Sequence, residues 1–217
     1  MALGVVLDAA ITSVLAAFIT FLTLSLLSVR KRILLPFLVL SLLLSVGLAA
    51  TGVDAYPFSN LPVLGFAIFG GSILGKLLSR RVFVFAAFLI AVSVLDIISF
   101  TGPGPNAPTT GTQSAQPALL EYLNFTIRSG ASHFFLGSLD LLLLSLVVMF
   151  FASRRYGNLG IVTYAFVALL FPTLFPFSQL IPGASSGIPI TPFIAAFAFP
   201  FYFLARPRKA MTEETGA

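Results

Sequence analysis

A chain of 217 residues with 58% hydrophobic and only 9% charged side chains has too little charge to solvate the surface of a water-soluble domain of its size. Soluble domains carry about 25% charged residues. The composition therefore excludes a soluble enzyme, a nucleic-acid-binding domain and a disordered tail. It favours a polytopic protein whose outer solvent is the lipid bilayer. The net charge of +5 does not indicate a nucleic-acid partner, because the basic residues stand in short clusters between apolar runs.

The chain has no cysteine and a single histidine. It therefore has no disulfide framework and cannot build a Cys- or His-based metal centre. No metal and no organic cofactor are expected. The N-terminus lacks the positively charged segment of a secretory signal peptide, so we expect the first apolar run to be retained as a membrane helix.

Seven apolar runs follow one another, each close to the roughly 20 residues that a helix needs to cross a bilayer. They lie near residues 4–28, 33–52, 60–78, 82–100, 131–152, 159–181 and 188–205. The runs are continuously apolar and do not alternate with polar residues, so strands are not expected. The sequence predicts an all-α polytopic membrane protein, with one transmembrane domain over residues 1–210 and a polar cytoplasmic tail over residues 206–217.

The basic residues predict the orientation of these spans. Clusters of Lys and Arg stand at the ends of the first, third, fifth and seventh runs. The other connections together hold a single basic residue, Arg128. The clusters are Arg30-Lys31-Arg32, Lys76 with Arg80 and Arg81, Arg154-Arg155, and Arg206 with Arg208 and Lys209. Because cytoplasmic loops are enriched in Lys and Arg, the N-terminus is predicted outside and the C-terminus inside a cell membrane.

The longest connection, residues 101–130, is predicted on the outer side. Its first half is rich in Gly, Pro, Thr, Ser and Gln, which is typical of a mobile linker. Its second half, Pro117–Ile127, is more apolar and is predicted to lie in the membrane interface as a short helix.

Two smaller features concern packing. The segment Gly70–Gly75 is rich in small residues, which predicts close packing between helices. His133 is predicted to be a hydrogen-bonding residue at the start of the fifth helix.

Ionisable side chains inside an apolar run are costly in hydrocarbon, so they are candidates for function. Asp96 and Asp140 are the two acids well inside apolar surroundings. Asp96 lies about 14 residues from the inner start of its run, and Asp140 lies about 12 residues from the inner end of the next run. At 1.5 Å per residue these heights differ by about 3 Å. The two carboxylates are therefore expected to face each other at one level.

Two facing carboxylates in a partly dry site do not both ionise easily, so one holds a proton while the other is charged. Such a pair can take a proton from water and give one to a peptide carbonyl, which is general acid–base hydrolysis without a metal. The same pair can bind a cation or relay protons in a transporter. Each Asp can also simply hydrogen-bond a hydroxyl of a neighbouring helix. The acid pair by itself leaves all three roles open.

Around the two acids, the chain resembles the intramembrane aspartyl proteases of the presenilin and signal peptide peptidase class. In that class one Asp follows Tyr, the second ends a Gly-x-Gly-Asp motif on the next span after a long connection, and Pro-Ala-Leu opens the last span. The corresponding segments here are Leu95-Asp96, Gly137-Ser138-Leu139-Asp140 and Pro189-Ile190-Thr191, followed by Pro192 and by the matching Phe201-Tyr202-Phe203. The resemblance covers residues 85–205.

The resemblance implies a shortened presenilin-like bundle that cleaves single-span transmembrane segments or signal peptides. Asp96 and Asp140 would be the catalytic residues. Gly137, Leu139, Pro189, Ile190 and Thr191 would form the substrate-binding site. Because Leu139 replaces the Gly that precedes the second Asp in the family, we expect it to narrow the approach of a substrate backbone. The implied partners are a transmembrane peptide and membrane lipid, with no nucleic acid.

Two other functions stay open at this point. A proton- or cation-coupled transporter would use the same Asp pair and would respond to ions or pH. A non-catalytic presenilin-like membrane protein would bind its substrates and would keep binding them after the loss of either carboxylate.

Overall fold

A computed structural model of the chain describes residues 2–51, 56–101, 124–129, 132–153, 192, 194–196 and 198. This part of the chain is predominantly helical, as the sequence predicts. The helices are α1 (Ala2–Ser25), α2 (Lys31–Thr51), α3 (Asn60–Leu78), α4 (Val82–Thr101) and α6 (Ser138–Ser153). Helices α1 to α4 occupy the first four predicted runs and differ from them by a few residues at most. The predicted run 159–181 lies outside the described residues, as do the linker and the C-terminal tail.

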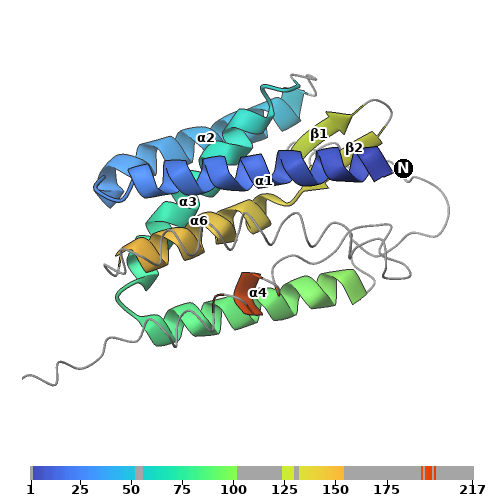
Figure 1. Cartoon of the computed structure of the whole chain (residues 1–217). Coiled ribbons are helices and arrows are strands. Elements are labelled where there is room, and N and C mark those ends of the chain that lie inside the picture. The colour runs from blue at the N-terminus through green and yellow to red at the C-terminus, as the bar shows by residue number, and fades with distance from the viewer. Residues whose placement is uncertain are drawn as a thin grey trace, which may run out of the picture.

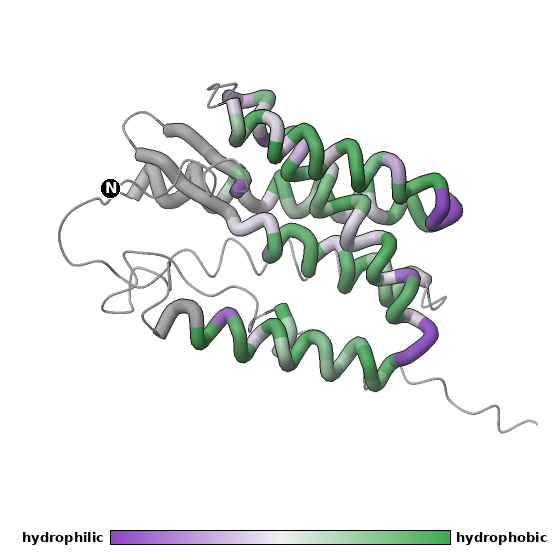
Figure 2. Tube along the Cα trace, turned by 180° about the vertical axis from the view of Figure 1, so that it is seen from behind, coloured by the Kyte–Doolittle hydropathy of each residue, from purple (hydrophilic) through white to green (hydrophobic). Residues whose placement is uncertain are grey.

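The helices are apolar along their length, and hydrophilic residues gather at their ends (Figure 2). Among the described residues, α2 and α3 are long and apolar enough to cross a membrane by length and composition. Two such apolar helices agree with the low charge of the whole sequence.

The fifth predicted run, residues 131–152, is helical only from Ser138 onward. Strand β2 (Ser132–Leu136) precedes the helix and pairs antiparallel with β1 (Phe125–Ser129), with Arg128 opposite His133. The expectation that the chain has no strands is therefore wrong here. His133 lies in a strand and does not start a helix, and the predicted interface helix ends in β1. Phe, Ile and Thr suit a pleated surface, and a short apolar run cannot be assigned to helix or strand by hydropathy alone.

Helix α6 lies at the centre of the molecule. All its residues from Leu141 to Phe151 are buried, which fits a helix that is apolar on every side. Helices α1 and α3 pack along α6, and α2 lies against α3 (Figure 1). Helix α4 runs along the side of this bundle, antiparallel to α6.

Two glycines allow the backbones of α3 and α6 to meet. A Cβ atom at Gly71 would stand 2.6 Å from the carbonyl oxygen of Leu142, and one at Gly75 would stand 2.7 Å from that of Leu146. Side chains larger than hydrogen do not fit at such distances, because the opposing atoms belong to the backbone. The predicted close packing of Gly70–Gly75 between helices is confirmed.

A buried pair of hydroxyl groups joins three helices in the same core. Thr23 of α1 and Ser145 of α6 share a hydrogen bond of 2.9 Å. The Ser145 hydroxyl also donates to the carbonyl oxygen of Ile68 in α3, at 3.2 Å. Hydrogen bonds of this kind between apolar helices contribute about 0.6 kcal/mol each and fix how the helices face one another.

Candidate functional site

Asp96 lies on the side of α4 that faces the bundle. This helix buries Phe85, Leu89 and Ser93, which are spaced one turn apart. Asp96 follows Phe85 by about three turns, so it returns to the same side of the helix. Its side chain is half-buried, whereas the neighbouring Leu95 is 65% exposed.

Asp140 lies in the first turn of α6. The carbonyl oxygen of Gly137 accepts hydrogen bonds from the N–H groups of Asp140 and Leu141, at 3.1 and 3.2 Å, and so begins the helix. An acid at this position interacts favourably with the positive end of the helix dipole. The sequence predicts Asp140 well inside a helix, but the structure places it at a helix start because the preceding residues form a strand.

Gly137 makes room for the carboxylate of Asp140. A Cβ atom at position 137 would stand 2.7 Å from Asp140 Oδ2. The group that would have to yield is the free end of a side chain, so an added methyl would move the carboxylate with little disturbance of the helix. Gly137 thus leaves open the space in which the Asp140 carboxylate lies.

An aromatic contact sets the register between α4 and α6. Phe85 stacks on Phe150 with ring centroids 3.6 Å apart, and it meets the edge of Phe151 at 6.2 Å. Helix α4 runs from this contact toward Asp96. Because α6 is antiparallel to α4, the same direction in space runs backward along the α6 sequence, from Phe150 to Asp140 (Figure 1).

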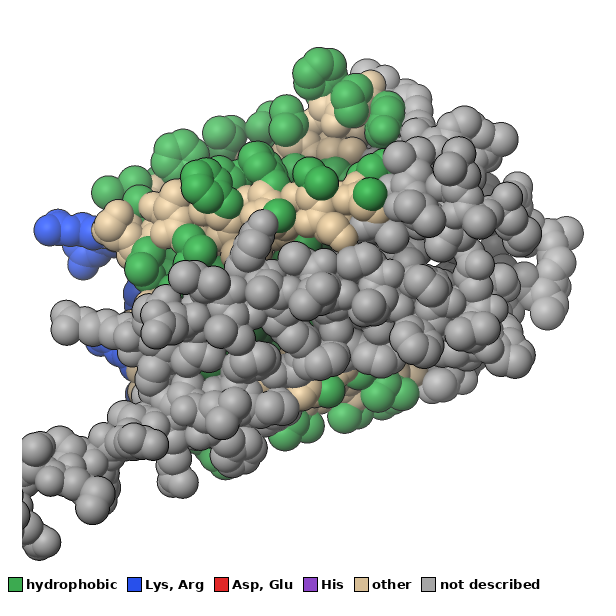
Figure 3. All heavy atoms as spheres, viewed as in Figure 1, with side chains coloured by type: hydrophobic (Ala, Val, Ile, Leu, Met, Phe, Trp, Pro, Cys, Tyr) green, Lys and Arg blue, Asp and Glu red, His purple; other side chains and the backbone are tan. Residues whose placement is uncertain are grey.

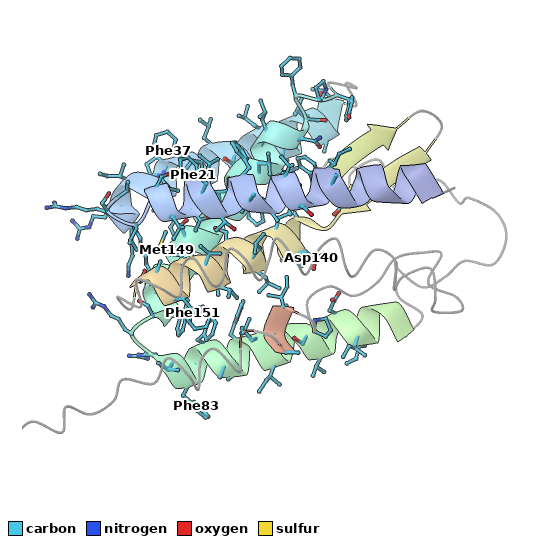
Figure 4. The ribbon with its side chains drawn as sticks, in the orientation of Figure 1. Phe21, Phe37, Phe83, Asp140, Met149 and Phe151 are labelled. Carbon is cyan, nitrogen blue, oxygen red and sulfur yellow. The ribbon has the colours of Figure 1, made fainter. Side chains whose placement is uncertain are left out.

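The helical rise from this contact predicts that the two acids lie at one level. Asp96 is three turns, or about 16 Å, from Phe85, and Asp140 is about 16 Å from Phe151. Each acid also shares a helix side with its phenylalanine. Figure 4 shows Asp140 at the start of α6, on the side toward α4.

The described residues of the last predicted run join the same core. Ile194, Ala195 and Ala198 are helical and buried, in a hydrophobic cluster that includes Phe85 and Leu141. Figures 1 and 2 both show this segment beside α4. Helices α4 and α6 and the described residues of the last predicted run thus contribute to one cluster.

The remaining predicted site residues are placed as follows. Leu139 is 60% exposed, so its side chain turns away from the core beside Asp140. Pro192 is helical and half-buried. Pro189, Ile190 and Thr191 lie outside the described residues.

Sequence reasoning missed the hairpin that leads directly into the Gly137–Asp140 turn. The signal for it is Phe125-Thr126-Ile127 on one side of Ser129-Gly130 and Phe134-Phe135 on the other, because these residue types favour strands. No such signal exists for the contact between Gly137 and the Asp140 carboxylate, which depends on where α6 begins. In the part of the chain that the structure describes, no three His, Asp or Glu side chains gather to hold a metal ion.

Comparisons with known protein families, with curated proteins and with solved structures find no match for this chain. Its function is therefore argued from the geometry of the site. The central features are one acid on each of two antiparallel helices, equally spaced from one aromatic contact, and a glycine beside the Asp140 carboxylate.

Proposed function

We propose that this protein spans the membrane and hydrolyses peptide bonds within it, with Asp96 and Asp140 as the catalytic pair. The observation that carries the proposal is the contact of Phe85 with Phe150 and Phe151, because an equal helical rise from this contact would bring Asp96 of α4 and Asp140 of α6 to one level. The resemblance of Gly137-Ser138-Leu139-Asp140 to the motif of intramembrane aspartyl proteases supports the same function.

Membrane residence is supported by the exposed apolar surface of α2. This helix buries Leu34, Ser41 and Ser45 and exposes large apolar side chains. The exposed ones are Ile33, Leu35, Phe37, Val39, Leu40, Leu42, Leu43, Leu44 and Val46. Water-soluble proteins rarely expose a continuous apolar patch of this extent, so hydrocarbon is the better solvent for this face.

The seven predicted spans, with the N-terminus outside and the C-terminus inside, are part of the proposal. Basic side chains gather at one end of the molecule (Figure 3). The α1–α2 turn and the α3–α4 turn both contribute to that end. This supports an inner membrane surface there.

The acid pair would hydrolyse the peptide bond by general acid–base chemistry. The charged carboxylate takes a proton from a water molecule, whose oxygen then attacks the carbonyl carbon of the substrate. The protonated carboxyl gives its proton to the carbonyl oxygen, and a tetrahedral diol forms. When the C–N bond breaks, one proton passes to the leaving amine and the diol becomes a carboxylic acid. The reaction consumes one water molecule and needs no metal.

The hairpin offers a way to hold the substrate in an extended form. Each of the two described strands pairs with the other along one edge only, and β2 ends at Leu136, beside Gly137. A peptide that added itself to the edge of this hairpin would run toward Asp140. Such pairing would expose a peptide bond that a helix shields.

A second candidate is a proton- or cation-coupled transporter that uses the same acids. The observation in its favour is a set of hydroxyl groups buried among α1, α3 and α6, of which Thr20 and Ser72 make no hydrogen bond to the described residues. Hydroxyl oxygens in a dry core can line a path for an ion.

A cleavage assay tests the proposal. The full chain is placed in liposomes with a panel of labelled single-span peptides, and it is compared with Asp96→Asn, Asp140→Asn and a matched control, Asp8→Asn. We expect cleavage within the apolar segment, lost in the first two variants and kept in the control.

If the folded protein cleaves no peptide, the protease proposal fails. Ion flux into the same liposomes that disappears in Asp96→Asn and Asp140→Asn would then favour the transporter.

A further inference from the structure

Two neighbouring turns carry the basic side chains at one end of the molecule (Figure 3). Arg30 lies between α1 and α2, and Lys31 and Arg32 begin α2, while Arg80 and Arg81 lie between α3 and α4. The four arginines are exposed and Lys31 is half-buried. The structure thus gathers five positive charges at the surface of this end.

Lys76 holds the α1–α2 turn against the end of α3. Its ammonium group points inward and donates hydrogen bonds to the carbonyl oxygens of Leu26 and Val29, at 2.6 and 2.5 Å. Both carbonyls lie in the turn after α1, where the helical hydrogen bonds end, and that of Leu26 also accepts from the N–H of Val29 at 3.1 Å. The position of the Arg30–Arg32 cluster is therefore held by this partly buried contact as well as by its own chain.

The described acidic side chains do not neutralise this end. Asp96 lies about four turns along α4 from Arg81, and Asp140 lies at the far end of α6. Like charges that share one surface repel one another, so this arrangement favours binding of an anion from outside.

Exposed apolar side chains adjoin both basic turns. Ile33 and Leu35, each 53% exposed, come directly after Arg32, and Phe83, at 86%, comes just after Arg81. Leu77, at 50%, precedes Arg80. The surface changes from guanidinium groups to hydrocarbon within one helical turn.

We infer that this basic end binds the headgroups of anionic phospholipids, with the lipid acyl chains lying along the exposed apolar side chains. Guanidinium groups pair with phosphate oxygens in a bidentate geometry. A free phosphate ion or an RNA strand would use the arginines but would leave Phe83 and Ile33 in water, whereas a phospholipid satisfies both. The inference rests on the proposed membrane residence and is independent of the Asp pair.

Lipid retention in nanodiscs tests this inference. The full chain is reconstituted in equal parts of phosphatidylcholine and phosphatidylglycerol, extracted into neutral detergent, and analysed for bound lipid by native mass spectrometry. We expect phosphatidylglycerol to be retained in preference. A double variant, Arg80→Gln with Arg81→Gln, should lower its affinity by about thirtyfold, since each of the two basic residues near an anionic surface contributes about 1 kcal/mol.

Two control variants make the result specific. Arg80→Lys with Arg81→Lys keeps the charge and should retain most of the preference. Arg128→Gln removes one charge from β1, at the opposite end of the molecule (Figure 1). It should leave the preference for phosphatidylglycerol unchanged.

Equal retention of both lipids, or a preference that survives loss of the arginines, would overturn the inference. Displacement of the lipid by inorganic phosphate or by a short RNA at a comparable concentration would overturn the lipid assignment. Failure of the protein to enter nanodiscs would instead contradict membrane residence. Peptide cleavage is measured in a separate assay, so a failure of the protease proposal is distinguishable from a failure of the lipid inference.

Discussion

The two helices that carry the acids are held in different ways. Helix α6 is buried on every side, and α3 meets its backbone directly at Gly71 and Gly75. Helix α4 buries one side, through Phe85, Leu89 and Ser93, and exposes large apolar side chains on the other. One acid therefore stands on the central helix of the molecule and the other stands on a helix at its edge.

This difference has a consequence for the proposed protease. A substrate helix has to reach the acid pair from the lipid, and a helix packed along one side is easier to displace than one packed all round. We therefore expect α6 to hold Asp140 in place and small movements of α4 to admit a substrate beside Asp96. Three substitutions test this contrast between a fixed helix and a peripheral one.

The largest effect is expected for Gly71→Ala, at the seam between α3 and α6. The new methyl would meet the Leu142 carbonyl oxygen at 2.6 Å and the Ser145 Cβ at 2.6 Å, so the two helices would have to separate. We expect a loss of about 3 kcal/mol in the free energy of unfolding, measured by thermal unfolding in detergent.

Gly47→Ala is the matched control for this change. Position 47 lies in α2, and a Cβ atom there meets nothing within 4 Å. Its effect should be neutral or stabilising by up to about 1 kcal/mol, because Ala favours a helix more than Gly does. Equal destabilisation by the two substitutions would contradict the tight α3–α6 seam.

A smaller loss of stability is expected for Phe85→Ala in α4. Phe85 is 2% exposed and stacks on Phe150. Its removal leaves a cavity and should cost about 2 kcal/mol, less than in a soluble core because lipid tails also solvate apolar groups.

The control for Phe85→Ala is Phe83→Ala, since Phe83 is 86% exposed and should contribute little. Limited proteolysis should cut the Phe85→Ala protein near α4 before it cuts α3 or α6. Simultaneous cleavage of all three helices would mean that α4 is not a peripheral unit.

The smallest effect on stability, and a large one on activity, is expected for Gly137→Ala. The methyl displaces the Asp140 carboxylate but touches no other described group within 3.4 Å. The melting temperature should change little, while peptide cleavage should fall by at least tenfold because the acid no longer faces Asp96. Loss of folding, or full activity with the native melting temperature, would count against Gly137 as a positioning residue.

Much of the helical framework could be predicted from the sequence. The first four helices coincide with apolar runs because charged clusters such as Arg30-Lys31-Arg32 mark their ends and cannot enter hydrocarbon cheaply. The close packing at Gly71 and Gly75 was also predictable, since small residues at helical spacing allow backbones to approach.

The start of α6 could not be predicted in the same way. Residues 132–136 are as apolar as the helix that follows, and hydropathy does not distinguish a short strand from a helix. Asp140 was therefore expected in mid-helix and lies instead in the first turn. The equal level of the two acids was predicted from distances to the inner ends of the runs. It stays a prediction, and the equal helical rise from the Phe85 contact supports it.

The most direct test of the central claim is cysteine cross-linking, which requires no substrate. The chain has no cysteine of its own, so Asp96→Cys with Asp140→Cys forms the single possible pair within one molecule. A short bifunctional thiol reagent should join this pair in the folded protein. Leu95→Cys with Leu139→Cys is the control, because both leucines turn outward. Cross-linking of the first pair alone is the predicted result. Equal cross-linking of both pairs, or none between positions 96 and 140 in a protein that melts normally, would contradict the facing acids.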